Sequence, residues 1–244
     1  MSIKSKRSNS ASILITVLGL VLLAVPASIN AQQPTTAKRV AAFKQSLAKS
    51  QAALRRYQWV ETTTVTYKGE VKSVKQNNCY YGADGGVQKT PIAGPAAPEP
   101  SSGGRGGRLK KKIIANKKEE LTDYMQRAVA LVGHYAPPDP DLVKYSQQTK
   151  NITVDPVEPN KVIRLSLPNF YKNGDLLSAT LDIVANMILD VNVSTWLESQ
   201  TDAVTLKILF DRLNDGTNYA SRTVLDAKSK KIVVTVENSG YRPL

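Results

Sequence analysis

The residues with the clearest capacity for acid–base chemistry lie close together in the sequence. His134 is the single histidine, and Asp139 and Asp141 follow it. A histidine oriented by a carboxylate can activate a nucleophile, but no serine or cysteine stands in a recognisable nucleophile elbow. Helix dipoles and capping account for these residues, and for Glu119 and Glu120, without any substrate. We therefore predict no catalytic residues and no enzymatic activity.

The cysteine and histidine counts exclude two other kinds of site. Cys79 is the single cysteine, so an intramolecular disulfide is excluded, and one cysteine with one histidine cannot form a Cys/His zinc cage. Residues 103–107 are rich in glycine, but they match no phosphate-loop spacing and follow no apolar strand. We predict no metal and no cofactor, and we expect Cys79 to be buried.

The first 31 residues are typical of a targeting signal. Lys4, Lys6 and Arg7 precede an apolar run at 13–25 that is short for a stable membrane span, and Ala31 provides a cleavage site. We predict a signal peptide at 1–31, an exported, periplasmic protein and a single domain at 32–244. The alternative is an uncleaved segment that anchors the same domain to the inner membrane.

The charge balance indicates which partners the protein meets. The chain has a formal net charge of +13, and removal of residues 1–31 takes away three basic and no acidic residues. A strongly basic exported protein encounters anionic lipid headgroups or envelope polymers before it encounters nucleic acid. We therefore expect an anionic membrane surface as a partner and no nucleic acid.

The remaining residues predict two or three helices and about nine strands. Helical spacing of apolar residues predicts helices over 36–57, 119–132 and 139–149. Strand-like segments bounded by turn residues are 59–67, 71–81, 87–92, 162–167, 177–184, 187–196, 203–213, 219–225 and 231–237. The connections between the later strands are too short for crossover helices, which indicates antiparallel pairing.

Alternation of apolar and polar residues in these strands predicts a sheet with one apolar face. Because so few helices are available to cover it, we predict an α+β fold, with a curved antiparallel β-sheet (half-barrel) and two or three helices packed on its concave face. The apolar residues expected to bind a ligand in that concavity are Leu121, Met125, Val129, Leu181, Ile183, Leu206, Ile208 and Phe210.

Residues 91–112 form the segment least able to bury apolar surface. The stretch 91–108 is rich in Pro and Ala and then in Gly, Ser and Arg, which predicts a flexible loop. The densest basic cluster in the chain overlaps its end. We expect contact with anionic lipid or polymer through Arg105, Arg108, Lys110, Lys111 and Lys112, and the alternative is a solvated tether that leads into a helix.

The order of elements resembles a known family. The signal peptide, the first helix, the hairpin WVETTTVTYKGEV, a helical middle and the strands VTLKILFDRLNDG and KIVVTVENSGY are similar in plan to the bacterial periplasmic lipoprotein carrier and sorting superfamily (LolA/LolB-like half-barrels). The resemblance implies an open, strongly curved sheet whose concave side holds acyl chains or another apolar ligand, with helices that close it and no catalysis.

These observations predict an exported, non-enzymatic protein that binds a lipid or a lipidated partner protein in an apolar concavity. Apolar burial would drive such binding. The alternative is a structural or adhesion module of the cell envelope, whose helices fill the concave face so that no ligand is needed. A cavity lined by Leu, Ile, Val and Phe favours the first reading, and a solid core favours the second.

Overall fold

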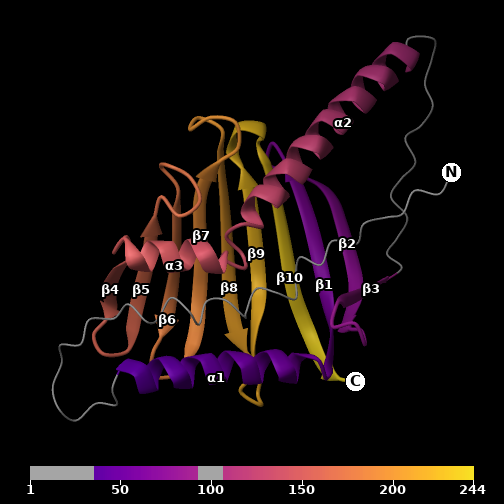
Figure 1. Cartoon of the computed structure of the whole chain (residues 1–244). Coiled ribbons are helices and arrows are strands. Elements are labelled where there is room, and N and C mark those ends of the chain that lie inside the picture. The colour runs from indigo at the N-terminus through magenta and orange to yellow at the C-terminus, as the bar shows by residue number, and fades with distance from the viewer. Residues whose placement is uncertain (1–35, 93–106) are drawn as a thin grey trace.

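A computed structural model describes residues 36–92 and 107–244, with side chains from residues 42 and 116 onward in the two ranges. It shows ten antiparallel strands in one sheet that curls without closing, with three helices against it (Figure 1). The predicted fold class, an α+β curved antiparallel sheet with helices on its concave face, is confirmed.

The helices and strands have the following bounds. The helices are α1 (Thr36–Leu54), α2 (Gly107–Val132) and α3 (Pro140–Gln148). The strands are β1 (Tyr57–Tyr67), β2 (Glu70–Tyr81), β3 (Val87–Pro91), β4 (Thr153–Glu158), β5 (Val162–Pro168), β6 (Leu176–Asp182), β7 (Met187–Trp196), β8 (Ala203–Arg212), β9 (Asn218–Ala227) and β10 (Ile232–Pro243).

The strand order in the sheet is β3-β2-β1-β10-β9-β8-β7-β6-β5-β4. Strands that follow one another in sequence therefore pair, except that β3 and β4 are the two edge strands, and β1 also pairs with β10. Strands β4 to β10 form one continuous antiparallel series, and β1 to β3 form a second series that attaches to the last strand of the first. This single non-local pairing places the amino-terminal hairpins beside the carboxyl-terminal strand.

The first hairpin illustrates how local sequence sets the strands. Strand β1 is rich in threonine, valine and aromatic residues, whose branched or bulky side chains suit a pleated strand. Lys68 and Gly69 then turn the chain, with φ values of 53° and 83°. Positive φ at both central residues is what a two-residue hairpin turn requires, and glycine adopts it without steric cost.

Two elements differ from the sequence-based expectation. Strand β4 was not predicted, because it is short, mostly exposed and interrupted by Pro156. Helix α2 begins at Gly107 and not near Glu119, so the carboxyl-terminal part of the predicted loop over 91–112 is helical. Residues 93–106, like the predicted signal peptide at 1–31, lie outside the described residues. Across 36–92 and 107–244, no helix combines the length and apolar character needed to cross a membrane.

The three helices pack against the middle and one side of the sheet. In Figure 1, α1 lies across the lower ends of the strands and α3 lies in front of β5 to β7. The amino-terminal half of α2 stands clear of the sheet, and no described helix runs across the middle of β1, β2 and β3 in this view. The main core is formed by strands β5 to β10 together with helix residues that include Phe43, Leu47, Ala128, Val132 and Val143.

Candidate functional site

A single row of paired residues crosses the inner, helix-bearing face of nearly the whole sheet. In order from β2 to β4 it consists of Lys75, Thr63, Val236, Thr223, Ile208, Val191, Ala179, Leu165 and Val154. The side chains from Ile208 to Leu165 are buried, whereas those from Lys75 to Thr223 are exposed or half-buried. The row divides the inner face into a covered half on β5 to β8 and an open half on β10, β1 and β2, with β9 at the boundary.

The next row repeats this division. From β2 to β5 it consists of Ser73, Val65, Val234, Leu225, Leu206, Val193, Leu177 and Leu167. The residues from Leu225 to Leu167 are buried, and the three in the open half are half-buried. The inner face of the open half is also more polar, because β2 contributes Ser73 and Lys75 to these rows, so the sheet residues and the partial helix cover together account for the difference in burial.

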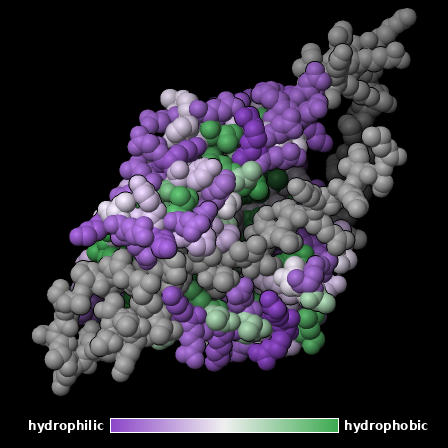
Figure 2. Space-filling view, viewed as in Figure 1, coloured by the Kyte–Doolittle hydropathy of each residue, from purple (hydrophilic) through white to green (hydrophobic). Residues whose placement is uncertain are grey.

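The open half carries an apolar strip, defined here as Val65, Tyr67 and Val234 of the sheet with Leu121 and Met125 of α2. All five side chains are half-buried and pack against the main core. In the space-filling view, a few hydrophobic side chains are visible near the middle of the molecule, and the coloured surface around them is mostly hydrophilic (Figure 2). The apolar strip is therefore an extension of the core that the helices cover only partly.

Further along β1, towards its start, the inner face becomes polar. Glu61 pairs with Asn77 on one side and Asn238 on the other. The Glu61 carboxylate is buried and accepts hydrogen bonds of 2.7 and 2.6 Å from Lys89 Nζ. Because a buried carboxylate without a partner is costly, Lys89 is needed to stabilise this end of the open half.

Aromatic side chains close the lower end of the open half. The ring of Trp59 stacks on Tyr241 at 5.6 Å and lies 5.4 Å from Tyr81, and its indole N–H donates to Asn238 Oδ1. Cys79, which pairs with Trp59, is fully buried, and burial raises the pKa of its thiol to about 11. The expectation of a buried cysteine is confirmed, and the thiol is protonated at neutral pH.

Helix α2 is held at the rim of the sheet by polar contacts. The Tyr124 hydroxyl donates to Asp202 Oδ1 at 2.6 Å, and Ser229 also donates to that oxygen. Burial, together with the hydrogen bond to Asp202, raises the pKa of Tyr124 to about 12. Arg127 pairs with Glu198 at 2.7 Å. These contacts position α2 above the β7–β8 and β9–β10 turns and so over the edge of the open half.

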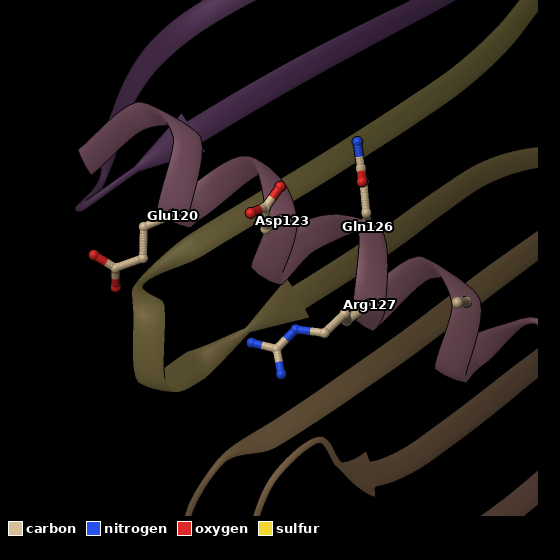
Figure 3. Close-up of a pocket in the computed structure, with 5 residues that line it drawn as sticks. Glu120, Asp123, Gln126 and Arg127 are labelled. Atoms are coloured by element: carbon tan, nitrogen blue, oxygen red, sulfur yellow. The ribbon is translucent and has the colours of Figure 1, made fainter. Parts of the chain in front are cut away.

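The solvent side of α2 bears an open groove of about 660 Å³. Figure 3 shows four of its lining residues, with Glu120 and Arg127 extending to one side of the helix and Gln126 to the other. The groove is lined by Glu120, Asp123, Gln126, Arg127 and Ala130. Because four of these five side chains are polar or charged, the groove does not suit an acyl chain.

The predicted ligand-binding residues occupy two different environments. Leu181, Leu206, Ile208 and Phe210 are buried in the main core, and Ile183 packs against it. Leu121 and Met125 belong to the apolar strip, whereas Val129 is exposed on α2, with 45% of its surface accessible. The structure therefore brings Leu121 and Met125 to the open half and places the four core residues beneath the helices.

The predicted basic contact falls mostly where side chains are not described. Arg105 lies outside the described residues. Arg108, Lys110, Lys111 and Lys112 are in the first two turns of α2, where only the backbone is described. The contact with an anionic surface stays a prediction.

The acid–base candidates have structural roles in this fold. His134 stacks on Tyr171 with ring centroids 4.2 Å apart. Asp139 caps α3 by accepting a hydrogen bond from the Asp141 backbone N–H. Glu120 forms ion pairs with Lys117 and Lys230. In the part of the chain that the structure describes, no group of three or more histidine, cysteine or acidic side chains is arranged to hold a metal ion.

Several residues of the open half, among them Val65, Tyr67, Val234 and Lys75, were not among the predicted site residues. The alternation in β10 and in β1 places the first three on the apolar face. A local pattern does not reveal, however, that β1 and β10 are neighbours or that helices leave them partly uncovered.

Comparison with known proteins gives a distant structural neighbour. No protein-family model matches the sequence, and no curated protein is similar to it at a significant level. Among solved structures, a DUF1329 family protein from Desulfovibrio piger aligns over 83% of this chain and 92% of its own, with 7% sequence identity and a TM-score of 0.35. A similarity this low assigns neither a family nor a function.

Proposed function

We propose that the protein binds the hydrocarbon chain of a lipid or of a lipidated partner in the open half of its sheet, without catalysis. The observation that carries the proposal is the apolar strip. Val65 and Val234 continue a row of buried core residues, yet they are only half-buried. An apolar guest that lies on these residues and against Met125 would complete the burial that the helices leave unfinished.

Apolar burial would supply the free energy of binding. Apolar burial contributes ~25 cal/mol per Å², so ~300 Å² of buried hydrocarbon would contribute ~7 kcal/mol before the cost of ordering the ligand. Only part of that surface has to come from Val65, Tyr67 and Val234, because Leu121 and Met125 of α2 lie opposite the sheet. Binding would therefore depend on the position of α2.

The basic segment and the targeting signal fit the same proposal. Export by residues 1–31 would bring the protein to the envelope. Basic residues near a charged membrane contribute about 1 kcal/mol each, so Arg105, Arg108, Lys110, Lys111 and Lys112 would bring α2 to an anionic surface. Since α2 borders the open half, that surface would be the source or the destination of the guest.

Ligand extraction tests the proposal directly. Protein purified from its host should carry lipid detectable by mass spectrometry, and delipidated protein should bind a fluorescent fatty acid. Val65→Ser should weaken this binding several-fold because it removes apolar contact. Val74→Ser is the matched control, since Val74 is a valine on the outer face of β2. Delipidated, folded protein that binds no fatty acid would overturn the proposal.

The second candidate is a structural or adhesion module of the cell envelope that binds no small ligand. This candidate is supported by the covered half of the sheet. There Leu181, Leu206 and Ile208 belong to the buried main core, so they leave no space for a ligand. This candidate predicts that the Val65→Ser and Val74→Ser variants behave alike in every binding assay. The paired variants therefore separate the two functions.

A further inference from the structure

The inner face of the open half changes from apolar to polar along β1. The residue pairs between β1 and β10 in this direction are Tyr67 with Ile232, Val65 with Val234, Thr63 with Val236, and Glu61 with Asn238. The Tyr67 pair and the Thr63 pair are four residues apart, a distance of ~13 Å along a strand. A ligand that followed β1 would therefore have one apolar end and one polar end.

Among the side chains that the structure describes, the polar end has one positive charge without an ion-pair partner. Lys75 pairs with Thr63 and so lies on the inner face, where its side chain is exposed. Among the residues whose side chains are described, Lys75 forms no ion pair. Lys89, in contrast, is held by Glu61 through both carboxylate oxygens. With Glu61 neutralised by Lys89, the charge of Lys75 sets the electrostatic preference at this end.

We infer that the guest is an amphiphile with an anionic headgroup, which lies with its hydrocarbon chain on the apolar strip and its headgroup at Lys75. This inference rests on the proposed function and specifies the ligand class and its orientation. The Asn77 amide, which lies on the same face one inner-facing position further along β2, would offer a hydrogen-bond donor to the same group. A carboxylate and a phosphate share this chemistry, because both are anionic and accept several hydrogen bonds.

The test compares single-chain ligands that differ only in the headgroup. Dodecanoate, dodecyl phosphate and neutral monododecanoyl glycerol are titrated calorimetrically into delipidated full-length protein. We expect both anionic ligands to bind about tenfold more tightly than the neutral one, which corresponds to a single charge-assisted contact. The ratio between dodecanoate and dodecyl phosphate distinguishes a carboxylate headgroup from a phosphate.

Two lysine variants assign the preference to one side chain. Lys75→Gln should abolish the preference and leave the affinity for the neutral ligand unchanged, and Lys75→Arg should keep it. Lys207→Gln removes the same charge from the outer face, where Lys207 pairs with Asn192, and should change nothing.

The outcomes separate the headgroup inference from the function. Equal affinities of the wild-type protein for anionic and neutral ligands, or a preference that persists in Lys75→Gln, would overturn the headgroup assignment and leave acyl-chain binding in place. No binding of any of the three ligands to folded protein would overturn the proposed function and the inference with it.

Discussion

The covered and open halves of the sheet share one architecture and differ in what lies on top of it. In both, inner-facing residues pair in the same rows, and the outer face carries polar contacts such as those from Thr180 to Asp190 and from Gln76 to Thr62. In the covered half, helix residues such as Phe43 and Leu47 contribute to the buried core. In the open half, the same kind of strand retains half-buried apolar side chains. The extent of burial on one sheet face thus depends on which part of that face the helices cover.

The largest difference between the halves should appear on truncation of a buried core residue. Leu181→Ala should lower the free energy of unfolding by about 2–5 kcal/mol, because Leu181 is fully buried and its loss leaves a cavity. Urea denaturation measures the change. A loss below about 1 kcal/mol would mean that the covered half is loosely packed and open to ligands as well.

The single cysteine reports on the local stability of the open half. Cys79 is buried on β2, so a thiol reagent reacts only after local or global opening. We expect an opening free energy about 2 kcal/mol below that of global unfolding, because β1 to β3 have few helix contacts. Labelling rates in low urea measure it. The control is Ala179→Cys in a Cys79→Ser background, because Ala179 is buried on the inner face of the covered half and should open only with the whole domain.

The hydrogen bond from Tyr124 to Asp202 should make a smaller contribution that depends on pH. Tyr124→Phe should cost about 1–2 kcal/mol at pH 8. Because the folded-state pKa of Tyr124 is raised from 10.0 to about 12, its contribution is complete below pH 10 and disappears as the pH approaches 12. In urea denaturation between pH 8 and 12, the free energies of unfolding of the wild type and the variant should therefore converge. A constant difference across this range would contradict the assigned bond.

The smallest effect on stability should come from the apolar strip itself. Val65→Ala should lower the free energy of unfolding by less than about 1 kcal/mol, since the side chain is only half-buried and leaves no closed cavity. The same variant should weaken fatty-acid binding. A stability loss as large as that of Leu181→Ala would show that the open half is ordinary core.

Much of the fold could be predicted from local sequence because strand alternation and turn residues are local signals. The predicted bounds of β7 match the structure, and those of β5 and β8 differ by one residue. Strand β4 could not be recognised, since Pro156 and its exposed side chains remove the pattern. The amino-terminal part of α2 was missed because its basic residues and the glycines before it favour a loop.

The sequence predicted that the sheet has an apolar face, but it did not predict which part of that face the helices leave open. Alternation put Leu181, Leu206 and Ile208 on the apolar face, where the structure has them. The packing of the three helices and the pairing of β1 with β10 determine which part of that face is covered. Neither contact leaves a periodic pattern in the sequence. Lys75 could be identified only through its register with Thr63.

The pairing of β1 with β10 has a consequence for the order in which the protein assembles. Strands β4 to β10 can pair one after another, because each is the sequence neighbour of the next. Strand β1, however, can pair with β10 only after the last strand has been made. Such a long sequence separation between paired strands slows folding. A chain that crosses a membrane before it folds gains from this delay. In the export proposed above, the early strands would stay unpaired with β10 until the last strand had crossed the membrane, so the sheet would be completed only after translocation.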